Sequence, residues 1–131
     1  MPHVNWLAVL AAAAASFVLG GAWYSGLFAK RWQAAAGVTD EQMRGGNKPL
    51  MFASAFVLAL IQSAVFAMFL GPNPALMLGV GAGFAAGLCW VAAGLAMTYV
   101  FEKRSVTLGL INGGYATLQF TLIGTILGAW H

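Results

Sequence analysis

Four long apolar stretches alternate with three shorter connectors along this chain of 131 residues. None of the four stretches contains Asp, Glu, Lys or Arg. A charge at the centre of a bilayer costs about 2.5–3.5 kcal/mol, and a spanning helix needs about 20 apolar residues. The pattern therefore predicts four transmembrane helices, over about residues 5–29, 49–70, 75–101 and 106–130.

The connectors indicate how these helices are joined. Residues 71–74 and 102–105 form very short links, so each link forces its two helices into an antiparallel hairpin. The stretches lack the apolar-polar alternation of barrel strands, which favours helices. We predict an all-α, up-down four-helix transmembrane bundle that forms a single membrane domain over residues 1–131.

The charges predict the orientation of the bundle. All six Lys and Arg, and all three Asp and Glu, lie in the connectors 30–48 and 102–105. Cytoplasmic loops carry an excess of Lys and Arg, so both connectors are expected in the cytoplasm and both chain ends outside (N-out/C-out). Only 7% of residues are charged, against about 25% in soluble domains. The net charge of +3 thus reports orientation, and nucleic acid is not an expected partner.

The 30–48 connector has structure of its own. Thr39 and Gln42 fit a capping box that begins a helical turn, and the glycine pair 45–46 ends that turn. Trp32 follows two basic residues, a pattern typical of side chains at the lipid headgroup level.

Small residues recur every four positions in each span, most clearly at Gly79, Gly83 and Gly87. Small faces let helix backbones approach closely in lipid, where the hydrophobic effect gives little drive for association. The stripe has two interpretations: tight packing inside the bundle, or an interface with a second copy or a partner.

Polar residues inside the spans also have two interpretations. Gln62 and Gln119 lie near mid-membrane, where they either hydrogen-bond across helices or line a narrow pocket for a neutral solute or lipid headgroup. The spans contain no acidic residue or histidine, which argues against a membrane-embedded proton relay.

Residues for catalysis or metal binding are sparse. His3 and His131 lie near the chain ends and would supply only two ligands, and Cys89 has no neighbouring base. We therefore expect no enzyme activity, no cofactor and no metal.

Several motifs together resemble a known family. They include the Gly-x-Trp-Tyr-Ser run at 21–25, the Phe-Glu-x-Arg run at 101–104 and the Asn-Gly-Gly-Tyr run at 112–115. In this order they resemble the bacterial membrane-protein family catalogued as domain of unknown function 1761. The resemblance implies a four-span protein of the bacterial inner membrane and implies no chemistry.

These motifs lie at the cytoplasmic ends of three predicted spans. We hypothesise that they form one polar-aromatic cluster; the alternative is an interfacial aromatic belt with helix-end capping. The candidate members are Trp23, Tyr24, Ser25, Glu102, Asn112 and Tyr115.

Two functions remain open. The chain is expected to be a non-catalytic accessory or assembly module that acts through helix contacts, as a homo-oligomer or a subunit of a larger complex in the lipid bilayer. The alternative is a small homo-oligomeric transporter or channel for a solute or lipid, in which Gln62, Asn112, Tyr115 and Gln119 would face one wet cavity.

The predicted orientation can be tested with a cysteine at position 73 in a Cys89→Ala background. We expect an impermeant thiol reagent to label Asn73→Cys in intact cells, because connector 71–74 is predicted outside. Protection of this cysteine, with labelling only after permeabilisation, would reverse the orientation.

Overall fold

The structure, a computed structural model, describes residues 5–39, 41, 48–71 and 74–130, without the side chains of Ser25 and Lys48. The regular elements in these ranges are all helical, so the all-α prediction is confirmed. Four helices are long and apolar enough to cross a membrane: Trp6–Tyr24, Pro49–Leu70, Leu76–Glu102 and Val106–Ala129. The predicted capping turn at 39–42 and the glycine pair 45–46 fall on positions outside the described residues.

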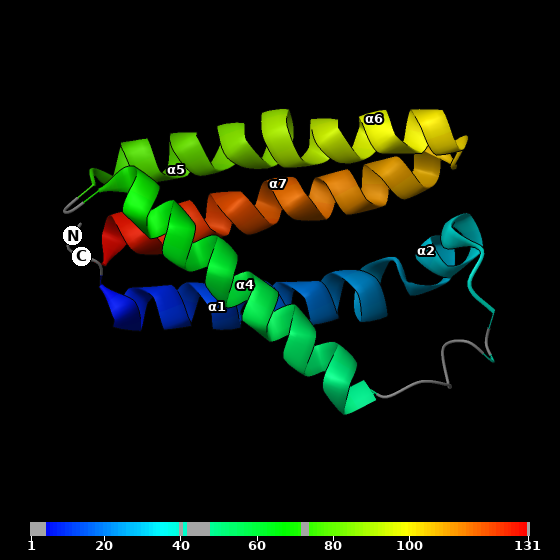
Figure 1. Cartoon of the computed structure of the whole chain (residues 1–131), viewed down its shortest axis with the longest axis horizontal. Coiled ribbons are helices and arrows are strands. Elements are labelled where there is room, and N and C mark those ends of the chain that lie inside the picture. The colour runs from blue at the N-terminus through cyan, green and yellow to red at the C-terminus, as the bar shows by residue number, and fades with distance from the viewer. Residues whose placement is uncertain (1–4, 40, 42–47, 72–73, 131) are drawn as a thin grey trace.

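The first span is not the uninterrupted helix predicted for residues 5–29. Helix α1 (Trp6–Gly21) widens into a π-helical segment, η1 (Ala22–Leu27), and the chain then breaks at Phe28, where φ is −126° and ψ is 17°. Helix α2 (Ala29–Ala36) follows at a new angle and packs against α7 (Figure 1). It ends at Gly37, whose φ of 73° suits a residue without a side chain.

Helix α4 (Lys48–Leu70) packs mainly on α1 and is the least buried of the four spans. Figure 1 shows α4 crossing α1 diagonally, so that its first turns lie well away from α7. Where α4 crosses α1, the ring of Phe17 makes two edge-to-face contacts. Its centre lies 6.0 Å from the ring centre of Phe52 and 6.1 Å from that of Phe56.

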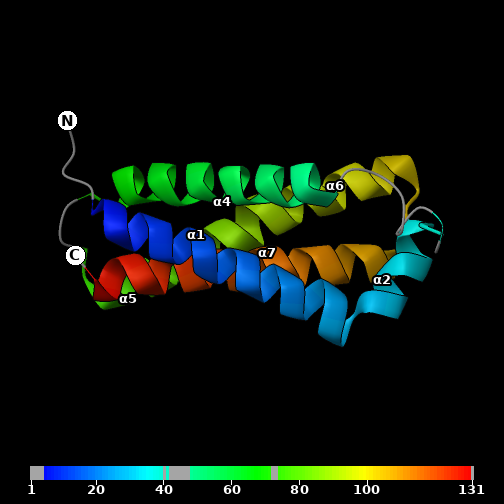
Figure 2. The same ribbon diagram turned by 90° about the horizontal axis from the view of Figure 1, so that it is seen from below.

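The third span consists of α5 (Leu76–Ala85), the π-helical segment η2 (Ala86–Ala92) and α6 (Ala93–Glu102). A tight turn at Lys103, with φ of 59°, reverses the chain into α7 (Val106–Ala129), whose first turn is capped by Ser105. Helix α7 is the central helix: it packs against α1, α5 and η2 (Figure 2), and Ile123 is completely buried.

The two ends of the bundle differ in chemistry. The side chain of Asn5 accepts a hydrogen bond from the amide of Ala8 and donates one to the carbonyl of Trp130, which joins the start of α1 to the end of α7. We call this the tail end. The opposite end holds the Lys103 turn and α2, and we call it the basic end.

The stripe formed by Gly79, Gly83 and Gly87 packs against α7 of the same chain. A Cβ atom at Gly79 would overlap the carbonyl oxygen of Gly124, and one at Gly83 would overlap that of Phe120. A Cβ at Gly87 would lie 2.6 Å from the carbonyl oxygen of Ala116. Backbone therefore meets backbone from the tail end to the middle of the bundle.

This contact predicts that Gly83→Ala destabilises the bundle by about 1–3 kcal/mol, because the added methyl forces two backbones apart. Gly81→Ala is the matched control: it lies in the same helix, is exposed, and nothing lies within 4 Å of an added Cβ. Thermal unfolding in detergent should give a lower Tm for Gly83→Ala only. Equal Tm values for the two variants would contradict the packing.

Candidate functional site

The π-helical segment η1 presents two aromatic side chains to α7. The amide of Phe28 donates a hydrogen bond to the carbonyl of Trp23 at 3.0 Å. This bond reaches back five residues, as in a π-helix, instead of the four of an α-helix. The indole Nε1 of Trp23 donates to the carbonyl of Ile111 at 2.9 Å. Short π-helical segments inside α-helices frequently occur at functional sites.

Asn112 of α7 joins two tyrosines that come from different spans. Tyr24 Oη donates to Asn112 Oδ1 at 2.6 Å, and Asn112 Nδ2 donates to Tyr99 Oη at 2.8 Å. The amide thus uses its acceptor and one donor at once, so η1, α6 and α7 are held together by one side chain.

Tyr115 completes this cluster one turn further along α7. Its Oη donates to the carbonyl of Ser16 at 3.0 Å, and its ring centre lies 5.3 Å from that of Tyr24. Trp32 of α2 also packs edge-to-face with Tyr24, with 5.8 Å between ring centres. We call Trp23, Tyr24, Tyr99, Asn112 and Tyr115 the Asn112 cluster.

The structure brings together four of the six predicted members: Trp23, Tyr24, Asn112 and Tyr115. Glu102 instead forms an exposed ion pair with Arg104, at 2.8 Å between Oε1 and Nε. No hydrogen bond joins Glu102 to the Asn112 cluster in the described part of the chain. The side chain of Ser25 is outside that part.

Sequence reasoning did not include Tyr99 in the cluster. Tyr99 lies one turn before Glu102 in α6, and the antiparallel pairing of α6 with α7 brings it to Asn112. The hairpin turn at 102–105 was the available signal, because it sets which positions of the two spans face each other.

A second polar contact lies closer to mid-bundle. Gln119 Nε2 donates to Gln62 Oε1 at 2.8 Å and so connects α7 to α4. Ser16 Oγ donates to the carbonyl of Ala12 at 2.9 Å, whereas the buried Ser63 Oγ has no hydrogen-bond partner within the described residues. Cys89 is exposed.

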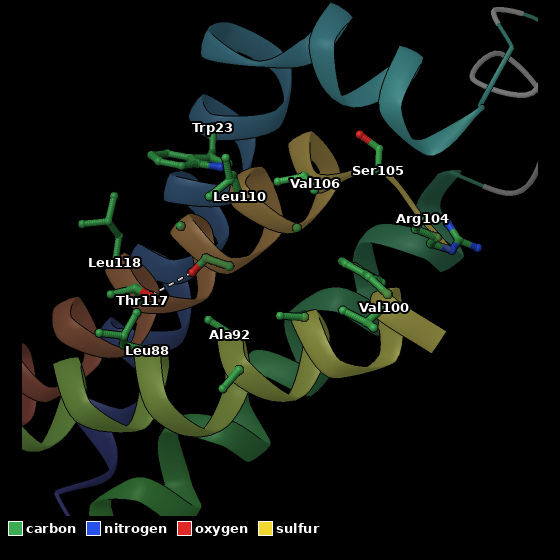
Figure 3. Close-up of a pocket in the computed structure, with 16 residues that line it drawn as sticks. Trp23, Leu88, Ala92, Val100, Arg104, Ser105, Val106, Leu110, Thr117 and Leu118 are labelled. Carbon is green, nitrogen blue, oxygen red and sulfur yellow. Dashed lines mark hydrogen bonds between the residues drawn. The ribbon is translucent and has the colours of Figure 1, made fainter. Parts of the chain in front are cut away.

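An apolar groove of about 720 Å³ runs along the α6–α7 pair near the basic end (Figure 3). Trp23 lies at one edge, and Arg104 and Ser105 lie at the end nearest the Lys103 turn. Its lining includes several small residues, Ala92, Ala93, Ala96, Gly109 and Gly113. Sequence reasoning did not identify this groove.

The groove follows from how the two helices separate. At the tail end, glycines bring α5 and α7 into backbone contact. Towards the basic end the contacts are through side chains: a Cβ at Gly113 would lie 3.2 Å from Ala92 Cβ, and one at Gly109 would lie 3.6 Å from a ring carbon of Tyr99. Small side chains on wider-spaced backbones leave the space open.

The chemistry of the Asn112 cluster is neutral, whereas the groove has one charged lining residue, Arg104. The Asn112 cluster consists of amide, phenol and indole groups that bond to one another or to backbone carbonyls. Within the described ranges, no three His, Cys, Asp or Glu side chains lie close enough together to hold a metal ion. The Asn112 cluster can hold helices in register and bind uncharged or weakly polar groups.

Comparison with known proteins gives one match. The sequence model of a family described as "Protein of unknown function (DUF1761)" matches residues 7–128. No curated protein and no solved structure matches the chain.

The geometry of the Asn112 cluster predicts energetic coupling between Tyr24 and Asn112. Tyr24→Phe and Asn112→Ala, singly and combined, should give a coupling free energy of about 0.6 kcal/mol in detergent unfolding, the average for hydrogen bonds between membrane helices. Thr98→Val, combined with Asn112→Ala in the same way, is a control that should show no coupling, since the Thr98 hydroxyl donates within its own helix, to the carbonyl of Gly94. Zero coupling, with every cellular phenotype unchanged, would reject a role for the cluster.

Proposed function

The chain belongs to the DUF1761 family, whose description assigns no function, and on this premise we propose a non-catalytic membrane module. In this proposal the protein is an accessory or assembly subunit of the bacterial inner membrane that acts through helix contacts. Connectors 30–48 and 102–105 face the cytoplasm. Their six Lys and Arg, and the absence of any in the four spans, support this orientation.

The observation that carries the proposal is the position of α4. It packs mainly on α1, its residues Ala59 and Ser63 are buried, and it reaches α7 through the Gln62–Gln119 bond. Its first turns lie away from α7 (Figure 1), although Phe52 and Phe56 contact Phe17 of α1. A helix that packs on one neighbour along its inner face offers a long apolar side to another membrane helix.

The side of α4 that faces away from α1 is large and apolar. Its exposed residues are Leu50, Met51, Val57, Leu58, Ile61 and Val65. Large apolar side chains at i, i+3, i+4 and i+7 form one stripe on a helix, and positions 50, 57, 58, 61 and 65 follow this spacing. This stripe suits helix packing and offers no polar path for a solute.

The polar residues that a transporter would use support the same reading. Gln62 and Gln119 bond to each other, and Asn112 and Tyr115 bond within the Asn112 cluster. None of the four lines the groove along α6 and α7. Because these four residues bond within the bundle, they stabilise it. The outer surfaces are then the parts of the molecule that can take part in assembly.

Native mass spectrometry of protein extracted gently from its own membrane tests the proposal. We expect the wild-type chain in an assembly with another protein. Leu58→Trp should release the single chain, because the bulky indole disrupts the α4 stripe. Val18→Trp, at a position that is at least as exposed but lies on α1, should leave the assembly intact.

A wild-type chain that is recovered only as a monomer would contradict the proposal. So would a homo-oligomer whose proteoliposomes pass small solutes, which would favour the transporter or channel. If the assembly survives Leu58→Trp unchanged, α4 is not its contact surface.

A further inference from the structure

The groove along α6 and α7 is a lipid-binding site: we propose that it holds one acyl chain of an anionic phospholipid, with the lipid phosphate at Arg104. The inference rests on the proposed insertion of the chain into a membrane. It adds a ligand that neither the family description nor the proposed function includes.

The size and lining of the groove fit an acyl chain. Its volume of about 720 Å³ lies in the range of about 300–1,000 Å³ usual for small-molecule sites. Figure 3 shows side chains of η2, α6 and α7 arranged along it, from Leu88, Thr117 and Leu118 at mid-bundle to Val106 near the basic end. The hydroxyl of Thr117, which lines the groove, donates to the carbonyl of Gly113 at 2.8 Å and so presents no free donor.

The exposure of the groove walls indicates that something outside the chain fills it. Val100, Val106 and Leu110 are 74%, 78% and 72% exposed although they line the groove. Water in such an apolar slot would have almost no hydrogen-bond partners. At this depth in a bilayer the surrounding medium is hydrocarbon, and a flexible chain can fill an irregular slot between rigid helices.

The charge at the groove mouth selects the headgroup. Arg104 lines the groove, and its guanidinium has the planar donor geometry that binds phosphate oxygens. Arg104 and its partner Glu102 are each about half exposed, and exposed ion pairs contribute little, so a phosphate can share the guanidinium. Lys103 and Arg104 outnumber Glu102 in this turn, which favours an anionic lipid over a zwitterionic one.

The acyl chain would also contact the Asn112 cluster. Trp23 and Tyr99 belong to both the cluster and the groove lining. The hydrogen bonds of their Nε1 and Oη atoms hold the aromatic edges in place, so the cluster shapes one wall of the groove. The lipid site and the family motifs thus share residues.

The test uses the full chain in detergent, with phosphatidylglycerol or phosphatidylcholine of identical acyl chains added at equal amounts. Native mass spectrometry measures the fraction of protein that retains one lipid. We expect wild type to retain phosphatidylglycerol about fivefold more than phosphatidylcholine, the ratio given by one extra basic contact. Arg104→Gln should abolish this preference, whereas Arg31→Gln, an exposed arginine outside the groove, should keep it.

A second pair of variants tests the groove itself. Ala96→Trp fills the slot and should lower retention of both lipids several-fold, while Ala85→Trp, exposed on α5 and outside the groove, should leave retention unchanged. Unfolding temperatures equal to that of the wild type would show that both variants are folded. Unchanged lipid retention in Ala96→Trp, or an equal loss in Arg31→Gln and Arg104→Gln, would overturn the proposal.

Failure of this site is distinguishable from failure of the proposed membrane module. Wild-type protein that resists alkaline carbonate extraction of membranes, yet shows no groove-dependent lipid retention, would reject the lipid site alone. Protein released by carbonate would reject both.

Discussion

Direct backbone contact between α5 and α7 is the interaction on which the rest of the structure depends. Within lipid, apolar side chains gain little by leaving the hydrocarbon for one another, so helices associate through close packing and a few hydrogen bonds. Gly79, Gly83 and Gly124 permit that packing because a Cβ at any of them would overlap a carbonyl oxygen of the other helix. The contact makes α7 the central helix, and α1 and then α4 pack outward from it.

The same contact explains both candidate sites. Glycine packing closes the third and fourth spans at the tail end, and contacts through larger side chains separate them towards the basic end. There the bundle relies on hydrogen bonds, and Asn112 supplies two of them by joining tyrosines from the first and third spans. The space left beside this polar joint is the apolar groove. Backbone packing thus joins the helices at the tail end, and side-chain hydrogen bonds join them at the basic end.

The sequence predicted the features that depend on composition and depth. Exclusion of charge from the spans predicted four long helices, which the structure contains. The similar depth of Gln62 and Gln119 suggested a contact between them, and the structure places a hydrogen bond there. Clustering of Trp23, Tyr24, Asn112 and Tyr115 could be hypothesised because all lie at one end of their spans.

Other features left no sequence signal. The π-helical segments η1 and η2 change only which backbone carbonyl each amide bonds, and they contain ordinary helix residues such as Ala and Leu. The diagonal crossing of α4 depends on the fit of Phe17 against Phe52 and Phe56, which single-residue patterns do not encode.

The central claim is that α5 and α7 of the same chain are in backbone contact. The most direct measurement is a filtered nuclear Overhauser experiment in detergent micelles, on equimolar chains carrying different isotope labels. The account predicts a contact between the Hα atoms of Gly83 and Gly124 within one chain; a contact seen only between differently labelled chains would contradict it.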